Sequence, residues 1–406
     1  MRELPEGWTS MPLLECGTWM SGGTPSTDNP SYWGGDIPWI SAASLKDFYI
    51  RDSERRITSL GARSGTRMAP KGAVLFVVRG MSLKTEFRVG VTQRELSFGQ
   101  DCKAIIPRPE IDGTFLGLAL KTHSSQVLGM VDEAGHGTGR LPIDMLSRLS
   151  IDIPSKREQQ NILNIFESID ARISATGRII AKLERINTGI KHREIETFLW
   201  SAQNSRSLLP LSAIAEIRSG VTLGSEPHGT ESIQVPYLRV ANVQDGHIDT
   251  REVKTIRIMR NELTKYLLLK GDVLLTEGGD FDKLGRGAVW DARISECISQ
   301  NHIFRVRCDQ SRLIPEFLSA YTSSHHGKRY FLSIAKQTTN LATINSTQLK
   351  SMPIPVPSLE VQKRLVNALE AHSAKVTTEK KQLKQLMLIK QGLMKDLLTG
   401  KVRANS

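Results

Sequence analysis

Basic side chains gather in two glycine-containing stretches of the chain, each of which follows an apolar run (74–78 and 273–275). A loop that leaves a strand, with glycine for close approach and Lys or Arg for phosphate oxygens or guanine edges, suits contact with nucleic acid. The alternative for each stretch is a solvated basic hairpin. The predicted base-reading residues are Arg79, Ser82, Lys84 and Arg88 in the first stretch and Asp280, Lys283 and Arg286 in the second.

The overall charge supports a polyanionic partner. The chain has 406 residues, with 54 Lys and Arg against 42 Asp and Glu, which gives a formal net charge of +12. Such an excess favours nucleic acid first and an anionic membrane second. No apolar run approaches the roughly 20 residues of a membrane span, and the first residues lack an apolar signal core. We therefore expect a cytoplasmic protein without membrane association, whose four scattered cysteines are reduced thiols.

The motifs that would indicate catalysis are incomplete in this sequence. Residues 29–32 (Asn-Pro-Ser-Tyr) resemble the Asn-Pro-Pro-Tyr loop of amino-group DNA methyltransferases, but Ser31 replaces a proline and no glycine-rich loop for a methyl donor follows, so a turn is favoured. Gly135–Gly139 is predicted to be a flexible turn rather than a dinucleotide loop. The histidines show no metal-ligand spacing. We expect no catalytic residues and no metal site, which favours a binding module over an enzyme.

The second half of the sequence repeats the first at an offset of about 200 residues. Both halves share the same residue types in the same order, although few residues are identical. The matching segments are 21–24 with 219–222, 36–47 with 234–245, 71–75 with 270–274, 100–101 with 300–301, and 146–159 with 349–362. Five ordered matches imply two copies of one domain.

A long helix is predicted to follow each copy. Pro154-Ser155 and Pro357-Ser358 suit helix starts with serine as the N-cap, and Glu158 completes a capping box that Val361 cannot. Apolar residues then recur at alternating spacings of 4 and 3, which is the seam of a coiled coil. The polar members of the seam, which would help to set the register of paired helices, are Asn187, His372, Glu379 and Lys390. The helices could pair within one chain, pack singly on their own domains, or dimerise two chains.

Together these segments resemble the DNA-specificity subunit of type I restriction-modification enzymes. The resemblance covers essentially the whole chain and is carried in both copies. In the first copy the residues that carry it are 4–8 (Leu-Pro-Glu-Gly-Trp), 32–41, 71–75 and 151–160. In the second copy they are 235–240 and 270–275, and residues 392–401 near the C-terminus match as well. The second copy departs from the pattern at Gln234, where the first has Asp36, and at Val361, where the first has Glu158.

The resemblance implies an α+β fold with two pseudo-repeated globular target-recognition domains, separated by two long helices that pair as an antiparallel coiled coil. The expected boundaries are 1–154 for the first target-recognition domain, 155–200 for the central spacer helix, 201–357 for the second target-recognition domain and 358–403 for the C-terminal spacer helix. Each domain would read one half of a split, asymmetric DNA site, and the helices would set the gap between the halves.

The same resemblance implies the partners. Double-stranded DNA and two modification (methyltransferase) subunits would join this chain, with two restriction (translocase-nuclease) subunits in the full complex. This chain would bind no cofactor of its own, because S-adenosylmethionine, ATP and Mg²⁺ would lie on the partner subunits. Two alternatives stay open: a self-contained DNA methyltransferase or nuclease, and a coiled-coil adaptor without DNA specificity.

Overall fold

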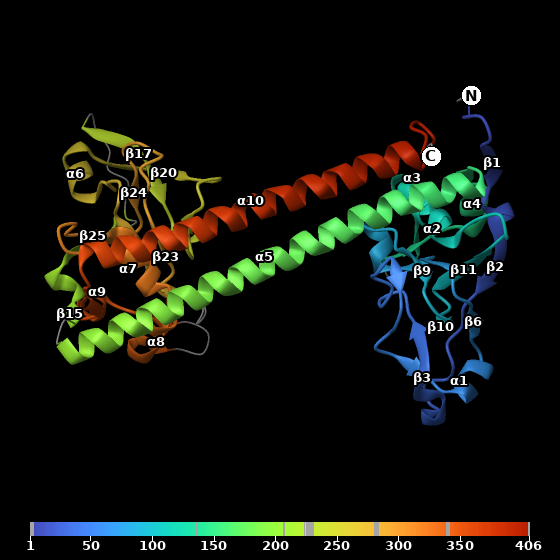
Figure 1. Ribbon diagram of the computed structural model, residues 1–406, viewed down its shortest axis with the longest axis horizontal. Coiled ribbons are helices and arrows are strands. Elements are labelled where there is room, and N and C mark those ends of the chain that lie inside the picture. The colour runs from blue at the N-terminus through green and yellow to red at the C-terminus, as the bar shows by residue number, and fades with distance from the viewer. Residues whose placement is uncertain are drawn as a thin grey trace. The chain divides into compact units, whose positions relative to one another are not determined.

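The computed structural model describes residues 4–134, 137–205, 208–222, 224, 231–279, 284–337 and 342–404. The chain forms two compact units: unit 1 contains residues 1–177 and 381–406, and unit 2 contains residues 178–380. Two long helices, α5 (Lys156–Ser205) and α10 (Leu359–Leu397), contribute to both units (Figure 1). Helix α5 thus runs beyond the predicted residue 200. Helix α10 ends before the predicted residue 403, and Gly400 follows it with a positive φ of 65°.

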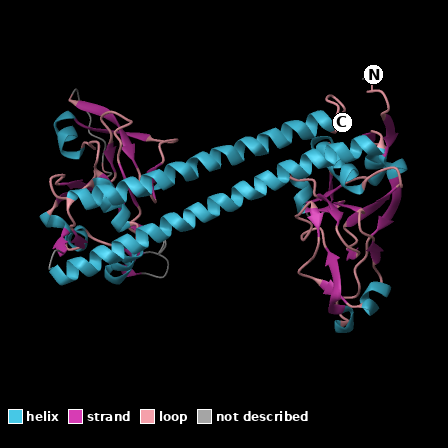
Figure 2. Ribbon diagram, in the orientation of Figure 1, coloured by secondary structure: helices cyan, strands magenta, loops and turns pink. Residues whose placement is uncertain are grey.

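The globular part of unit 1 is a set of small sheets with short helices (Figure 2). The largest has the order β2 (Gly17–Ser21), β11 (Cys102–Pro107), β7 (Val74–Val77), β9 (Val89–Thr92), β4 (Tyr49–Ile50), and a second has the order β5 (Arg56–Ile57), β3 (Trp33–Ile40), β10 (Leu96–Phe98), β6 (Arg67–Ala69). The others are β12 (Asp132–Ala134), β13 (Thr138–Arg140), β8 (Arg79–Gly80), and the pair β1 (Thr9–Pro12), β14 (Ser150–Ile153). The helices are η1 (Leu13–Cys16), η2 (Pro30–Tyr32), α1 (Ser59–Arg63), η3 (Met81–Lys84), α2 (Gly113–Thr122), α3 (Ser124–Leu128) and α4 (Ile143–Ser147).

Unit 2 repeats this arrangement. Its sheets have the orders β16 (Ala215–Ser219), β25 (Ile303–Cys308), β21 (Val273–Thr276), β23 (Gly287–Val289); β20 (Lys254–Met259), β17 (Ser232–Leu238), β24 (Ile298–Ser299); and β22 (Gly278–Gly279), β27 (Ala342–Thr343), β26 (Lys336–Gln337). Two pairs complete the strands: β15 (Leu208–Pro210) with β28 (Pro353–Pro355), and β18 (Val243–Gln244) with β19 (His247–Ile248). The helices are η5 (Leu211–Ala213), η6 (Val240–Asn242), η7 (Arg260–Glu262), α6 (Leu263–Tyr266), α7 (Pro315–Thr322), α8 (His325–Ile334) and α9 (Ser346–Lys350).

The strand register shows that the two units are copies of one domain. In unit 1, Val74 pairs antiparallel with both Ile105 and Val91. In unit 2, Val273 pairs antiparallel with both Val306 and Val289. The parallel pairs β3–β10 and β17–β24 also correspond. The internal repeat predicted from the sequence is therefore confirmed.

The core of each unit lies around its central strand. All four residues of β7 are buried, and so are all four of β21. Seven of these eight residues are apolar, as expected for strands that are covered on both faces, and the eighth is Thr276. Helix α2 contacts β7 in unit 1, and α7 contacts β21 in unit 2. Apolar burial of this kind supplies most of the driving force for folding.

Helix α5 begins as the sequence predicted, but Glu158 has a different role. The Ser155 hydroxyl accepts a hydrogen bond from the Glu158 N–H at 3.3 Å, which confirms the serine N-cap. The Glu158 carboxylate, which a capping box would direct to the backbone of Ser155, accepts hydrogen bonds from the Trp8 indole at 3.1 Å and from the Arg403 guanidinium at 2.7 and 2.8 Å. The start of α5 is thereby tied to both ends of the chain.

The two long helices contact each other within each unit (Figure 1). In unit 1 the Lys390 ammonium lies 2.5 Å from the Asp170 carboxylate. In unit 2, Lys380 pairs with Glu184 at 2.8 Å, and Asn187 donates to the Ser373 hydroxyl at 3.4 Å. The partner numbers fall as the α5 numbers rise, so the helices are antiparallel. Two of the four polar seam residues, Asn187 and Lys390, thus contact the facing helix as predicted.

All four cysteines are free and buried. Burial raises the pKa of the Cys102 thiol to about 12, so this thiol stays protonated at neutral pH. In the described part of the chain, no helix combines the length and the apolar character needed to cross a membrane.

A fully buried glutamine near the start of each long helix holds its globular domain. The Gln159 amide donates to the carbonyls of Glu110 and Pro154 at 3.0 and 2.9 Å, and its oxygen accepts from the Asp112 N–H at 2.8 Å. Gln362 makes the same three bonds in unit 2. Its partners are the Arg312 carbonyl at 2.8 Å, the Pro357 carbonyl at 2.9 Å and the Ile314 N–H at 2.9 Å. Both side chains are 0% exposed, so no solvent replaces these bonds.

We predict that Gln159→Leu destabilises unit 1. The leucine removes the hydrogen-bond partner of one N–H and two carbonyls. Pro154 is buried, Asp112 is half-buried and Glu110 is exposed, so one or two of these groups stay unsatisfied, at about 1–3 kcal/mol each. Urea unfolding followed by circular dichroism should show a loss of about 2–4 kcal/mol. The control is Gln160→Leu on the next, exposed residue, whose amide bonds only within the helix. Equal midpoints for the two variants would contradict this role of Gln159.

Candidate nucleic-acid interface

The first predicted basic stretch lies at the edge of a small sheet in unit 1. Arg79 opens β8, and Ser82 and Lys84 belong to η3, which follows at once. Arg79 faces Arg140 of β13 in the antiparallel register, and Arg140 in turn faces Asp132 of β12. Arg79 and Arg140 are exposed. Two guanidinium groups on neighbouring strands therefore stand at the surface where a polyanion could reach them.

An open cleft of about 810 Å³ lies against this sheet. Donors and carboxylates both line it. The donors are Arg79, Gln100, Lys103 and Arg140, and the carboxylates are Asp101, Asp132 and Asp144. Such a mixed lining suits base edges, which offer both acceptors and donors, better than it suits phosphate alone.

The other residues predicted in the first stretch are less free than Arg79. The Lys84 ammonium lies 3.9 Å from the Glu133 carboxylate and is 41% exposed. The Arg88 guanidinium donates to Glu86 at 3.0 Å and to the carbonyls of Ala42 and Ala43 at 3.4 and 3.3 Å. Ser82 is half-buried in η3. Arg79 and Lys84 are thus the members of the set that a ligand reaches most easily.

Only part of the second predicted stretch can be placed. Asp280 and Lys283 lie outside the described residues. Arg286 is half-buried, and its Nη1 donates to the Gln244 side chain of β18 at 3.1 Å. The preceding Gly285 has a φ of +65°, and a Cβ there would lie 2.2 Å from the Phe331 ring. Glycine is therefore required immediately before Arg286.

Matching backbone hydrogen bonds anchor both stretches to the sheets. The Val77 N–H donates to the Arg88 carbonyl at 3.0 Å, and the Thr276 N–H donates to the Arg286 carbonyl at 2.8 Å. A second matching pair joins Leu141 N–H to the Val78 carbonyl and Ile344 N–H to the Glu277 carbonyl, each at 2.9 Å. Arg88 and Arg286 thus occupy equivalent positions at the ends of equivalent loops.

The exposed side chains on these equivalent strands differ between the two copies. The strand registers of the two copies are the same. Arg79 of β8 therefore corresponds to Gly278 of β22, and Arg140 of β13 corresponds to Thr343 of β27. The first copy therefore carries two guanidinium groups where the second carries none.

Sequence reasoning missed several of these residues. Arg140, Lys103 and Gln100 line the cleft but lie far from Arg79 in the chain, so local spacing gives no signal for them. The glycine-rich segment 135–139 was the available hint, but its prediction as a flexible turn is wrong at Thr138 and Gly139, which belong to β13, and residues 135–136 lie outside the described part of the chain. The turn predicted at residues 29–32 is confirmed. The Asn29 side chain accepts from the Ser31 N–H at 3.1 Å and caps η2.

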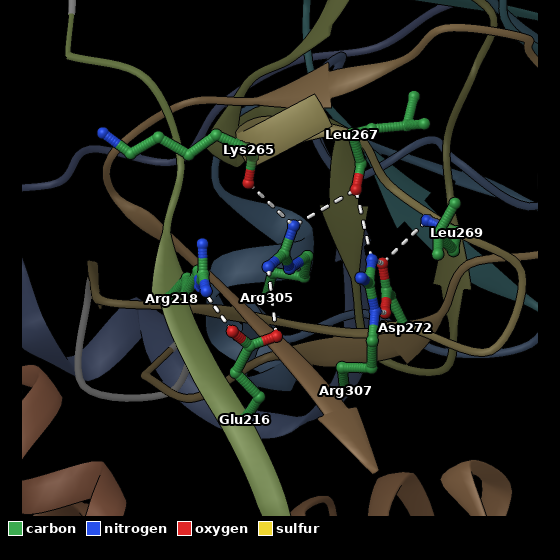
Figure 3. Close-up of polar contacts among 8 residues, drawn as sticks. All are labelled: Glu216, Arg218, Lys265, Leu267, Leu269, Asp272, Arg305 and Arg307. Carbon is green, nitrogen blue, oxygen red and sulfur yellow. Dashed lines mark hydrogen bonds and ion pairs between the residues drawn. The ribbon is translucent and has the colours of Figure 1, made fainter. Parts of the chain in front are cut away.

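An ionic network built around the buried Asp272 and Arg305 supports β21, the strand that leads into the second stretch (Figure 3). Asp272, just before β21, is 1% exposed and accepts from the Arg307 Nε and Nη2 at 2.7 and 2.8 Å. The Leu269 N–H donates to the same carboxylate at 2.7 Å. The hydrogen bond with Asp272 raises the pKa of Arg307. A bidentate pair of this kind fixes the strand β25 against the start of β21.

A second arginine extends this network. Arg305 is 3% exposed, and its Nη1 donates to the carbonyls of Lys265 and Leu267 at 3.1 and 3.2 Å (Figure 3). Its Nη2 lies 3.5 Å from Glu216, which also pairs with Arg218 at 2.5 Å. Burial lowers the pKa of Arg305. The network thus holds the segment 265–269 over the central sheet of unit 2.

The duplicated geometry has a counterpart among known protein families. The family model described as "Type I restriction modification DNA specificity domain" matches residues 5–185 and again residues 209–388. This chain belongs to that family. The two matches coincide with the two copies seen in the strand registers, and the resemblance found in the sequence is confirmed.

Two relatives match this chain along almost its whole length. The chain is 22% identical to the type I restriction enzyme MjaIX specificity subunit of Methanocaldococcus jannaschii, over 99% of this chain and 95% of that protein. It is 23% identical to the type I restriction enzyme EcoKI specificity subunit of Escherichia coli K12, over 99% of this chain and 89% of that protein. A match to the putative MjaX specificity subunit reaches 27% identity but covers 49% of this chain and 45% of that protein.

Solved structures show the same fold. A chain from a study of complex assembly and conformational transition of the type I restriction-modification system superposes with a TM-score of 0.62, at 16% identity, over 99% of this chain and 100% of the other. The HsdS subunit from Thermoanaerobacter tengcongensis gives a TM-score of 0.55, at 15% identity, over 99% of both chains. The specificity-domain fold predicted from the sequence, with two pseudo-repeated domains and two long helices, is therefore confirmed.

We predict that Arg307→Met destabilises unit 2 strongly. The substitution leaves the Asp272 carboxylate buried with the loss of its two strongest hydrogen bonds, and an unpaired buried charge costs about 3–5 kcal/mol. Thermal unfolding should show the loss, and the double variant Asp272→Leu with Arg307→Met should recover part of it. Arg293→Met, which breaks an exposed pair with Asp291, should change stability by less than about 1 kcal/mol. A double variant less stable than Arg307→Met would contradict the account.

Proposed function

We propose that this chain is the DNA sequence-specificity subunit of a type I restriction-modification complex, in which each globular domain reads one half of a bipartite DNA site. One observation carries the proposal: the specificity-domain family matches the chain twice, on two copies of one strand frame. The adaptor alternative has no comparable support, because the full-length relatives are specificity subunits. The basic loops of the first copy supply groups that bind base edges and phosphates.

The DNA site would be asymmetric. The two copies share their register, but Arg79 and Arg140 of one correspond to Gly278 and Thr343 of the other. Arginine reads guanine with two hydrogen bonds, whereas threonine offers one hydroxyl and a methyl group and glycine offers neither. Equivalent faces with different donors select different base sequences. The half-sites would therefore differ from each other.

Catalysis would come from other subunits. The chain would have no active site of its own, and two modification subunits would bring S-adenosylmethionine to adenine. In the full complex, two restriction subunits would supply ATP-dependent translocation and cleavage, with Mg²⁺. The support for this division of labour is family membership together with the incomplete catalytic motifs of the sequence.

The long helices would set the gap between half-sites and dock the modification subunits. At about 1.5 Å per residue, a helix of 39 residues such as α10 is about 58 Å long. Three consecutive apolar residues near its end, Met387, Leu388 and Ile389, are each more than half exposed. Consecutive helical positions cover more than half of the helix circumference, so this apolar segment cannot be buried by a single neighbouring helix. It would form part of the docking surface.

Co-expression with the modification subunits should yield methylated adenines on a split, asymmetric motif. Arg286→Ala should relax one half of that motif, and Arg79→Ala should relax the other. A bidentate contact with guanine contributes about 1–3 kcal/mol of discrimination. Methylation mapping across genomic DNA reads both halves in one experiment.

The control for both variants is Arg293→Ala, which removes an exposed guanidinium already paired with Asp291 and should leave the motif unchanged. An equal loss of methylation at all sequences would indicate a phosphate contact instead of base reading. Methyl transfer by this chain without the added subunits would overturn the proposed division of labour.

We also predict that Leu388→Lys weakens assembly with the modification subunits while the chain stays folded. A lysine at an exposed position costs the fold little, but it places a charge in an apolar interface. Size-exclusion chromatography of the co-expressed subunits should show free subunits in place of the complex. Leu60→Lys, at an exposed leucine of α1, should assemble normally. Complete assembly by Leu388→Lys would exclude this segment from the interface.

A further inference from the structure

Two histidines and a carboxylate meet in unit 2, where helix α5 passes the start of α8. His192 and Glu196 lie one helical turn apart on α5, and their Nδ1 and Oε1 atoms are 3.8 Å apart. His326, the second residue of α8, places its Nε2 2.6 Å from the same Oε1. One potential ligand atom from each residue lies within 4.8 Å of the other two. The rings of His192 and His326 are nearly parallel, at 15°, with centroids 6.4 Å apart.

We propose that His192, Glu196 and His326 form a binding site for a divalent transition-metal ion of the Zn²⁺ type, which joins the long helix α5 to the globular domain of unit 2. Imidazole nitrogen and carboxylate oxygen are ligands that such ions prefer, at about 2.0–2.2 Å. Ligand atoms around a tetrahedral ion lie roughly 3.3 Å apart at these bond lengths. The observed separations bracket that value, so small side-chain rotations close the site.

The surroundings leave the cluster accessible on two sides. His192 lines a cavity of about 730 Å³, and Glu196 and His326 line another of about 430 Å³. Solvent can therefore supply further ligands, and an ion can enter without unfolding. Lys328, the nearest lysine on α8, pairs with Asp245 at 2.6 Å, and Lys191 donates to the Ser323 hydroxyl at 3.1 Å. Both ammonium groups therefore have partners other than Glu196.

The proton balance is simple. In the metal-free state His326 Nε2–H donates to the Glu196 carboxylate, so one proton occupies the place of the ion. The hydrogen bond from His326 lowers the pKa of Glu196, which keeps the carboxylate ionised. The ion needs the lone pair of Nε2, so binding releases the Nε2 proton to solvent while Nδ1 takes up a proton from solvent, and the imidazole stays neutral with no net proton release. The hydrogen bond between His326 and Glu196 is replaced by a bond from each residue to the ion.

The site was not apparent in the sequence because its parts are far apart. The adjacent pair His325-His326 shows no carboxylate at metal-ligand spacing. The carboxylate comes from α5, 130 residues earlier, and it becomes a neighbour only when α8 packs beside that helix. Histidine and glutamate at positions i and i+4 on one helix face are common without metal. The contribution of His326 from a second element is what makes the cluster a candidate site.

The test is a titration of the full chain, without a histidine tag, with Zn²⁺ by calorimetry and with Co²⁺ by visible absorption. We expect a single saturable site and a thermal midpoint that rises with Zn²⁺ and returns to its initial value with a chelator. His192→Ala and His326→Ala should each raise the dissociation constant more than about tenfold. His192→Ala keeps the bond between His326 and Glu196, so it separates metal binding from folding.

The matched control is His302→Ala. His302 Nδ1 lies 2.6 Å from the Glu277 carboxylate, which gives a pair of the same length without a second histidine. This variant should bind Zn²⁺ like the unaltered chain. Failure of the unaltered chain to bind Zn²⁺ would overturn the proposal, and so would binding that survives both His192→Ala and His326→Ala. The readouts involve neither DNA nor partner subunits, so they are independent of the proposed specificity function.

Discussion

The fold depends on a buried side-chain amide at the fourth residue of each long helix. Gln159 and Gln362 each bond the backbone of neighbouring segments through an amide that donates two hydrogen bonds and accepts one. Glutamine suits this role because its amide has both kinds of group at one end. A glutamate could not donate, and a leucine could do neither. The orientation of each globular domain on its helix start follows from these bonds.

The two copies keep the same strand register but fill it with different chemistry. The positions of Asp272, Arg305 and Arg307 are held in unit 1 by Ala73, Ala104 and Ile106, as the shared pairing of Val74 and Val273 requires. An ionic network in unit 2 takes the place of these apolar side chains along the two inner strands of the sheet, β25 and β21. A buried ion pair is often no more stabilising than an apolar core, so stability alone does not explain the difference. It shows that the two copies keep the backbone pairing of these strands while the side chains at these three positions differ.

Much of the secondary structure and of the duplicated architecture could be predicted from the sequence, but few of the contacts in the candidate nucleic-acid interface could. Ser155 as an N-cap, the strand at 74–78 and the turn at Asn29 depend on neighbours within a few residues, and these local rules determined them. The repeat supplied the architecture because duplicated order survives low identity. By contrast, the contact of Arg88 with Ala42 and the pairing of Arg79 with Arg140 join distant segments. Neither residue type nor spacing encodes such contacts before the chain has folded.

The frame also explains how a reading surface can change without loss of the fold. Both basic loops are closed by backbone bonds, from Val77 to Arg88 and from Thr276 to Arg286. A backbone N–H and carbonyl make almost no demand on the side chain between them, apart from glycine at a position such as Gly285 where the φ is positive. Substitutions within the loops therefore leave the anchors intact. If these loops read DNA as proposed, specificity would reside in their side chains and stability in the anchors, and the two properties would vary almost independently in each copy.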